Sequence, residues 1–192
     1  MKKSKIFTVP FRRKKEGRTN YKKRLALLLS NKPRLVIRKS LKNVTAQIVT
    51  YDSNGDRIIT AAHSSELRKR CGWSHSTGNI PAAYLTGLLL GKKAADKDIK
   101  EAILDIGLQK SVVKGRIYAA LKGALDAGMG VPHSEKVLPD EKRISGEHIK
   151  SYAEKAGQEN KTSQFSALKS SNVDVSSITA AFNDCKKKIL EE

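Results

Sequence analysis

The sequence has little cysteine, little aromatic content and no long apolar run, and each shortage excludes a class of protein. Its two cysteines, Cys71 and Cys185, match no metal or redox spacing, so we expect reduced thiols, and a disulfide is unsupported. The longest apolar run, LTGLLLG at 85–91, is far shorter than the roughly 20 residues that a membrane span requires. The stretch IFTVPF at 6–11 is too short for the core of a signal peptide. We therefore expect a soluble cytoplasmic protein without a membrane partner.

Enzyme signatures are missing as well. The sequence contains no GxGxxG, Walker A, HExxH, GxSxG or paired CxxC motif. Cys71 and His75 lie near one another in CGWSH, but a zinc site needs four ligands and no second pair is present. We interpret this stretch, which includes Trp73, as structural or RNA-contacting, and the sequence does not say which. No cofactor, metal ion or small-molecule substrate is expected.

The acids are the remaining route to catalysis, because a mixed α/β sheet can host a two-metal nuclease. Asp52 and Asp56 fall in a turn, where Asp is favoured for conformational reasons alone. Asp105 falls within a predicted strand, and Asp126 lies near the end of a predicted helix. Two-metal chemistry requires acids that converge on two ions about 4 Å apart. Nothing in this spacing indicates convergence, so we interpret all four acids as structural.

Positive charge is what the sequence has in excess. The net charge is +19 and the isoelectric point is near 10.0. Residues 1–51 contain 16 Lys and Arg against a single acid, Glu16, whereas residues 52–192 contain 22 bases and 18 acids. Eight of the fourteen residues in FRRKKEGRTNYKKR, at 11–24, are Lys or Arg. Because such charge repels itself, its concentration at one end predicts a polyanionic partner.

The amino-terminal segment is predicted to be an arm followed by a helix. Residues 1–18 have no apolar periodicity and are predicted to be extended. Thr19 is the predicted N-cap of a helix that ends near Ser30. Four apolar residues at helical spacing share one face of this helix: Tyr21, Leu25, Leu28 and Leu29.

The middle of the chain is predicted to form an α/β fold. Three segments rich in β-formers, separated by turn signals, predict an antiparallel meander: 34–39, 44–51 and 57–64. The period then changes, which predicts helices at 64–71, 80–91 and 113–128 and a buried strand at 101–108. This order indicates a mixed sheet covered by helices on its faces.

From position 135 the sequence is looser and more polar. Its last segment regains an amphipathic stripe, with Asp174 or Ser176 as the cap and Ile178, Phe182, Cys185 and Ile189 on one face. We therefore expect three parts, namely a basic arm at 1–18, an α/β core at 19–134 and a helical extension at 135–192.

The basic excess continues from the arm into ordered elements. The residues concerned are Lys22, Lys23, Arg24, Arg34 and Arg38. A phosphate-backbone binder needs both parts, because a rigid part fixes register and an arm adds counterion release. Four aromatic residues are interleaved with this charge and are candidates for stacking on unpaired bases: Phe7, Phe11, Tyr21 and Tyr51. We therefore predict that the protein binds nucleic acid.

Six blocks of sequence carry a resemblance to a known family. In chain order they are RTNYKKRLALL, RLVIRKSLKNVTAQIV, NIPAAYLTGLLLGKKA, AILDIGL, GRIYAALKGALDAGMGVPHSE and RISGEHI. Together they resemble the archaeal form of large-subunit ribosomal protein eighteen, whose eukaryotic relative is large-subunit protein five. The resemblance covers roughly residues 5–150, and beyond 150 it extends only to general character. Where the family usually has an acid, this chain has Asn20.

The resemblance implies a structural constituent of the large ribosomal subunit. It implies binding to 5S rRNA and anchoring of that RNA to the large-subunit rRNA in the central protuberance, beside neighbouring ribosomal proteins. The implied fold is a three-layer α/β/α core with a ribonuclease-H-like motif and no nuclease activity. Carried onto this sequence, the RNA-contacting residues are Arg12, Arg13, Lys14, Lys15, Arg18, Lys22, Lys23, Arg24, Arg34, Arg38, Lys39, Lys42 and Arg116.

Two other classes of function are alternatives. One is an RNA-processing nuclease built on the same sheet architecture. The other is a protein that compacts DNA or binds anionic membranes without specificity. Cleavage of RNA in the presence of Mg²⁺ or Mn²⁺ would distinguish the first, and competition between 5S rRNA, duplex DNA and anionic vesicles would distinguish the second.

Overall fold

A computed structural model describes residues 8–158, 165–170 and 173–191. Its centre is a four-stranded sheet in the order β3-β2-β1-β4. The strands are β1 (Arg34–Lys39), β2 (Val44–Thr50), β3 (Arg57–His63) and β4 (Ile103–Asp105). The first three form the predicted antiparallel meander, and β4 pairs parallel to β1. The predicted α/β class with a mixed sheet is confirmed, although β4 is shorter than the apolar run that indicated it.

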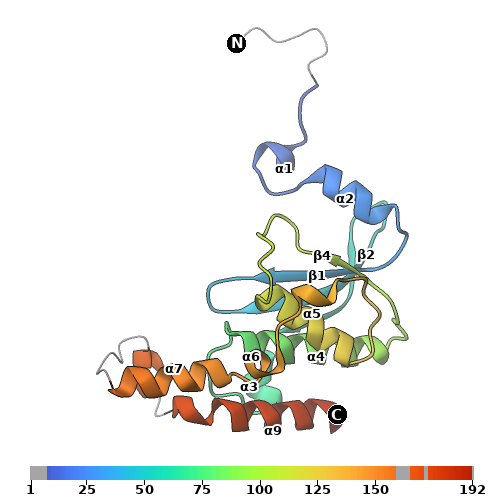
Figure 1. Cartoon of the computed structure of the whole chain (residues 1–192). Helices are drawn as coiled ribbons and strands as arrows, with labels where there is room; N and C mark the ends of the chain where they lie inside the picture. The colour runs from blue at the N-terminus through green and yellow to red at the C-terminus, as the bar shows by residue number, and fades with distance from the viewer. Residues whose placement is uncertain (1–7, 159–164, 171–172, 192) are drawn as a thin grey trace, which may run out of the picture.

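Alternation along β1 determines which face of the sheet is buried. Leu35 and Ile37 are fully buried and pair with Ile48 and Ala46 of β2. Their face packs against α4 (Ile80–Ala95) and α5 (Arg116–Asp126), which lie side by side below the sheet in Figure 1. Arg34, Val36 and Arg38 therefore belong to the opposite face, because successive strand residues point to opposite sides.

Two glycines bring α4 and α5 unusually close. A Cβ atom on Gly87 would lie 1.9 Å from the carbonyl oxygen of Ala120, and one on Gly123 would lie 2.1 Å from that of Tyr84. Each helix therefore places a glycine against the backbone of the other. This close approach makes the α4–α5 pair a compact support for the sheet.

The carboxyl-terminal helices form a further layer beneath α4, visible at the bottom of Figure 1. They comprise α6 (Glu141–Ile144), α7 (Glu147–Gln158), α8 (Ser166–Ser170), η3 (Val175–Ser177) and α9 (Ile178–Glu191). The short η1 (Glu135–Val137) precedes them and accepts a hydrogen bond from the N–H of Lys114, just before α5. The predicted α9 stripe is buried and belongs to the same apolar core as α4. Asp174 accepts a hydrogen bond from the backbone N–H of Ser176 at 3.0 Å, which caps the turn that leads into α9.

The amino-terminal segment differs from the prediction in two respects. Residues 12–15 of the predicted extended arm form a short helix, α1 (Arg12–Lys15). Helix α2 (Tyr21–Leu28) is capped by Asn20, not Thr19, because the Asn20 side chain accepts a hydrogen bond from the N–H of Lys23. No residue of α2 is buried, so its apolar stripe does not enter the core. Residues 1–7, including Phe7, lie outside the described residues.

The stretch around Trp73 follows α3 (Glu66–Arg70) and belongs to the core. Trp73 and His75 are each 1% exposed, and their rings meet edge to face at 5.3 Å. The Trp73 indole donates to the carbonyl of Ser76. Cys71 and Cys185 are both buried and form no disulfide, as predicted, and the Cys185 thiol donates to the carbonyl oxygen of Cys71. The structural interpretation of this stretch therefore holds.

No helix in the described ranges is both long and apolar enough to cross a membrane.

Candidate nucleic-acid interface

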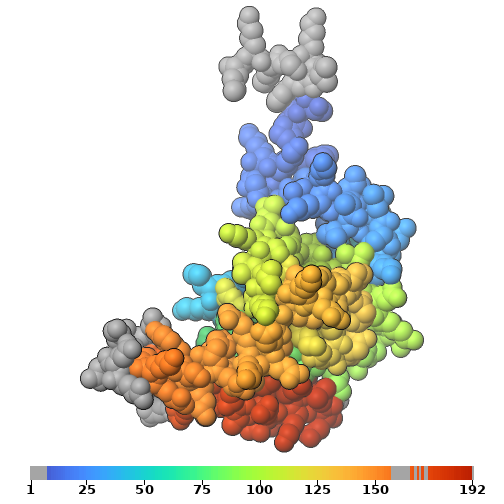
Figure 2. Space-filling view, viewed as in Figure 1, coloured from blue at the N-terminus to red at the C-terminus, as the bar shows by residue number. Residues whose placement is uncertain are grey.

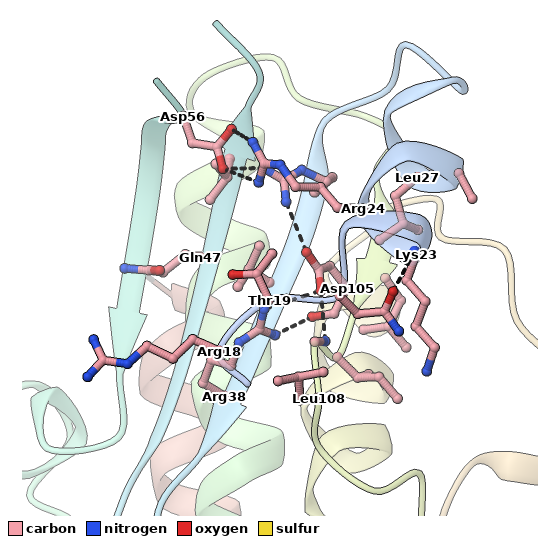
Figure 3. Close-up of a pocket in the computed structure, with 18 of the residues that line it drawn as sticks. Arg18, Thr19, Lys23, Arg24, Leu27, Arg38, Gln47, Asp56, Asp105 and Leu108 are labelled. Atoms are coloured by element: carbon pink, nitrogen blue, oxygen red, sulfur yellow. Dashed lines mark hydrogen bonds and ion pairs between the residues drawn. The ribbon is translucent and has the colours of Figure 1, made fainter. Parts of the chain in front are cut away.

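The sheet face opposite α4 and α5 borders an open cavity of about 640 Å³. Helix α2 stands over one side of it, and the loop after β4 closes another side (Figure 3). Its apolar lining comes mainly from the sheet and the loop: Val36, Val49, Ile58, Leu104, Ile106 and Leu108. Its cationic lining comes from the amino-terminal segment and β1: Arg13, Arg18, Lys23, Arg24, Arg34 and Arg38. The cavity thus combines an apolar floor with a cationic rim.

Arg34 is the centre of an ion-pair network on this face. Its guanidinium donates to Asp56 from Nη2 at 2.6 Å and to Asp105 from Nη1 at 2.9 Å. Arg24 holds the same Asp56 in a bidentate pair, with both distances 2.7 Å. Helix α2 buries none of its residues, and the Arg24–Asp56 ion pair joins it to the meander.

Arg38 extends the network along β1. Its Nη2 lies 3.2 Å from Asp105 Oδ1, and its Nη1 donates to the main-chain carbonyls of Asp105 and Ile37. Asp105 Oδ1 also accepts from the N–H of Gly107 at 2.8 Å. Parallel pairing explains this convergence, because β4 places Asp105 directly beside Val36, between the two arginines.

The network carries three guanidinium groups and two carboxylates, so one positive charge remains in excess. The Arg34 side chain is only 4% exposed, whereas Arg38 remains 41% exposed. Arg34 Nε is buried without a hydrogen-bond partner among the described residues. Removing one member of such a buried pair strands the other charge in a region of low dielectric, which is strongly destabilising. The network therefore fixes the polar face of the sheet.

Hydrogen bonding sets the ionisation of Asp56. The Arg24 guanidinium, followed by that of Arg34, holds the pKa of the Asp56 carboxyl below its usual value, against the opposing effect of desolvation. Because the folded-state pKa is lowered, this contribution to stability is present above the ordinary Asp pKa and is lost as the pH falls through the folded value. At neutral pH the Asp56 carboxylate is therefore ionised, and it accepts hydrogen bonds from Arg24 and Arg34.

The acids were interpreted from sequence as structural and as not converging on metal ions, and two of them prove to meet at an arginine. Asp56 and Asp105 both meet at Arg34, so they converge on a guanidinium and not on a metal ion. Among the described residues, no three His, Cys, Asp or Glu side chains are grouped so that they could hold a metal ion. Sequence reasoning missed these two acids as members of the site. The available signal was the pair of arginines on one strand face, which requires counter-charges when buried.

The other predicted contact residues fall into three groups. Around the arm, Arg12 and Arg18 each pair with Glu16, at 3.4 and 3.2 Å, and Arg13 Nε donates to Thr19. Six lysines have ammonium groups that make no hydrogen bond or ion pair with another described residue: Lys14, Lys15, Lys22, Lys23, Lys39 and Lys42. The third group is Arg116 alone, whose Nη1 donates to the carbonyls of Ser40 and Gly78 at 3.0 and 2.9 Å.

The aromatic residues near this surface are partly engaged with one another. The rings of Phe11 and Tyr21 lie 5.0 Å apart at an interplanar angle of 45°. Phe11 and Tyr51 are largely exposed, and Tyr21 is half-buried. Stacking of these rings on unpaired bases stays a prediction.

These features define a basic α/β protein whose cationic side chains surround an open sheet face. Comparison with known proteins identifies its family. The model of the family described as "Ribosomal large subunit proteins 60S L5, and 50S L18" matches residues 5–100 and 91–134. The large ribosomal subunit protein uL18 of Methanococcus maripaludis is 50% identical over 186 residues, which cover 96% of each chain. The chain belongs to this family, which consists of structural ribosomal proteins and not of enzymes. It is a structural constituent of the large ribosomal subunit.

Proposed function

We propose that this protein binds 5S rRNA and anchors it to the large-subunit rRNA within the central protuberance, where it contacts neighbouring ribosomal proteins. One observation carries the proposal. The open face of the sheet is lined by arginines of the amino-terminal segment and β1 and by the unpartnered Lys23, while the opposite face is buried under α4 and α5. Lys14, Lys15 and Lys22, on α1 and α2, also have no partner among the described residues. Cations without a protein partner on an ordered surface are available to phosphate groups.

The surface supplies both kinds of contact that RNA recognition uses. Lys14, Lys15, Lys22 and Lys23 on α1 and α2 neutralise phosphates along a strand. The apolar floor of the cavity accepts the face of an unpaired base, and Arg38 at its rim, which is 41% exposed, reaches the adjoining phosphate. Arg34 has a different role in this proposal. Its guanidinium is buried and both of its terminal nitrogens are paired with carboxylates, so it positions Arg24 and Arg38 and does not itself contact RNA.

The nuclease alternative is not supported by any feature of the site. A metal-dependent nuclease needs carboxylates that face a cation in the substrate cleft. Here the Asp56 and Asp105 carboxylates are occupied by guanidinium groups at 2.6–3.2 Å. Labelled RNA incubated with the protein and Mg²⁺ or Mn²⁺ is therefore expected to stay intact. Cleavage that disappears in Asp105→Ala would refute the proposal.

The proposal is tested by the affinity of the full chain for a 5S rRNA transcript across a salt series. Lys22→Ala/Lys23→Ala is compared with Lys136→Ala/Lys142→Ala, which removes the same net charge from exposed lysines of the carboxyl-terminal segment. Each phosphate contact contributes about 0.7–0.9 to the slope of log K against log salt. The first variant is expected to flatten the slope by roughly 1.4–1.8, and the second to leave it unchanged. Equal slopes for both variants would contradict the proposed surface, as would duplex DNA or anionic vesicles displacing the transcript at equal mass.

A further inference from the structure

The tip of the β1–β2 hairpin presents an apolar side chain to solvent. Leu41 is 95% exposed, more than any other large hydrophobic residue among those described. It occupies the turn Ser40–Asn43, which projects from the body of the protein at the left of Figure 2. A leucine so placed contributes almost nothing to folding, because it buries no surface. Its side chain is therefore available to a partner outside the chain.

The backbone of this tip is fixed by hydrogen bonds to its own carbonyl groups. Ser40 donates from its N–H and its hydroxyl to the carbonyl of Asn43, at 2.8 and 3.0 Å. Arg116 donates to the carbonyl of Ser40 at 3.0 Å, and Thr77 donates to the carbonyl of Lys42 at 2.8 Å. The tip is consequently a rigid turn whose carbonyls are used inside the protein.

A second loop supports the tip from behind. The Asn43 side-chain oxygen accepts hydrogen bonds from Thr77 at 2.8 Å and from Ser64 at 3.3 Å. Gly78 comes so close that a Cβ atom there would lie 2.8 Å from the carbonyl oxygen of Leu41. The Leu41 side chain is thus held in a fixed outward position, and a partner that covers it does not need to order the turn first.

The charges beside Leu41 indicate what kind of partner fits. Lys39 and Lys42 lie on either side of it in the hairpin, and their ammonium groups have no partner among the described residues. An apolar side chain between two free cations matches a nucleic-acid strand, in which apolar base faces alternate with phosphates. Apolar side chains are known to act as wedges against base steps, and RNA offers unstacked bases in loops and bulges.

We infer that Leu41 is an apolar wedge that packs against unstacked bases of ribosomal RNA, with Lys39 and Lys42 on the flanking phosphates. This inference rests on the proposed function and adds a contact to it that does not depend on charge. It also gives Arg116 a positioning role, because that guanidinium joins the tip to the Gly78 loop.

The distinctive property of a wedge is that its contribution does not depend on salt. Replacing Leu41 by alanine removes the apolar surface and no charge, so Leu41→Ala is expected to weaken binding by roughly tenfold at every salt concentration. Its salt slope should equal that of the wild-type protein. Lys42→Ala should instead flatten the slope by about 0.7–0.9, the value of one phosphate. Leu190→Ala, at an exposed leucine of α9, is the matched control and should bind as the wild type does.

The measurement uses the full chain and every rRNA transcript, 5S or large-subunit, that the wild-type protein binds. Thermal unfolding should show no change for Leu41→Ala, since the side chain is outside the core. If the wild type binds no rRNA transcript, the proposed function itself fails. If the wild type binds and Leu41→Ala binds every transcript equally well, the wedge is refuted while the proposed function stands. Loss of affinity confined to low salt also overturns the wedge, because it would indicate an electrostatic effect.

Discussion

Replacing Asp105 by asparagine should destabilise the protein far more than an ordinary loss of surface charge. The Asp105 carboxylate accepts from Arg34 at 2.9 Å, from Arg38 at 3.2 Å and from the N–H of Gly107 at 2.8 Å. An asparagine keeps one acceptor oxygen but turns N–H donors toward the buried Arg34 guanidinium. Breaking a buried pair costs about 3–5 kcal/mol. Since Asp56 still holds Arg34, we expect the lower end, about 3 kcal/mol.

The matched control is Asp140→Asn. Asp140 pairs with Lys114 at 3.0 Å, but both side chains are about half exposed or more, at 67% and 45%. An exposed pair of this kind is worth about 0.2–1 kcal/mol. Urea unfolding can be followed by the fluorescence of Trp73, the single tryptophan, which is buried. For Asp105→Asn we expect a lower midpoint at unchanged m-value, and a melting temperature lower by about 6–12 °C.

The reasoning is refuted if Asp105→Asn and Asp140→Asn differ by less than about 1 kcal/mol. A second variant distinguishes the contribution of the ion pair to stability from that of side-chain packing. Replacing Arg34 and Asp105 together by Met and Leu removes both charges, so it should recover part of the stability that Asp105→Asn loses. A double variant less stable than Asp105→Asn would indicate that shape, and not the stranded charge, determines the loss.

Two further predictions concern the core. Gly87→Ala should destabilise the protein by about 2 kcal/mol, because its Cβ would lie 1.9 Å from the carbonyl oxygen of Ala120. Alanine normally stabilises a helix interior by about 1 kcal/mol over glycine, so a raised melting temperature would contradict the close approach of α4 and α5. Burial lowers the pKa of the His75 imidazole below its ordinary value of 6.5, and partial desolvation followed by the charge of Arg143 lowers the pKa of His148 at the surface. The unfolded state therefore binds these protons first, and stability should fall as the pH drops below about 6.5. His75→Gln should reduce this dependence in unfolding measurements between about pH 7.5 and 5.5, and an unaltered pH profile would refute the assignment.

The buried face of the sheet was predictable from sequence because it depends on the order of residues within each strand. Leu35 and Ile37 lie two positions apart on β1, out of step with Arg34 and Arg38, so the buried face follows from the period of two. The amphipathic stripe of α9 predicts its buried face in the same way. In each case the pattern and the observed burial agree because the partner surface is apolar.

The remaining features depend on contacts that sequence spacing does not encode. Leu25 and Leu29 have helical spacing, yet Leu25 on α2 and Leu29 at its C-cap are both exposed, because a stripe indicates a face and not what covers it. Asp105 meets Arg34 only because β4 pairs parallel to β1, a register that no local signal specifies. The observed N-cap of α2 lies one residue after the predicted Thr19. Thr and Asn are both good caps, and it is the Asn20 side chain that accepts a hydrogen bond from the Lys23 N–H.

The central claim is that the basic amino-terminal segment and the open sheet face contact 5S rRNA inside the large subunit. Crosslinking native particles, followed by mapping of both peptide and nucleotide, tests it most directly. We expect crosslinks from residues 11–24 and 34–42 to 5S rRNA, and none from α4 or α5. Particles in which those two segments crosslink to no 5S nucleotide would contradict it.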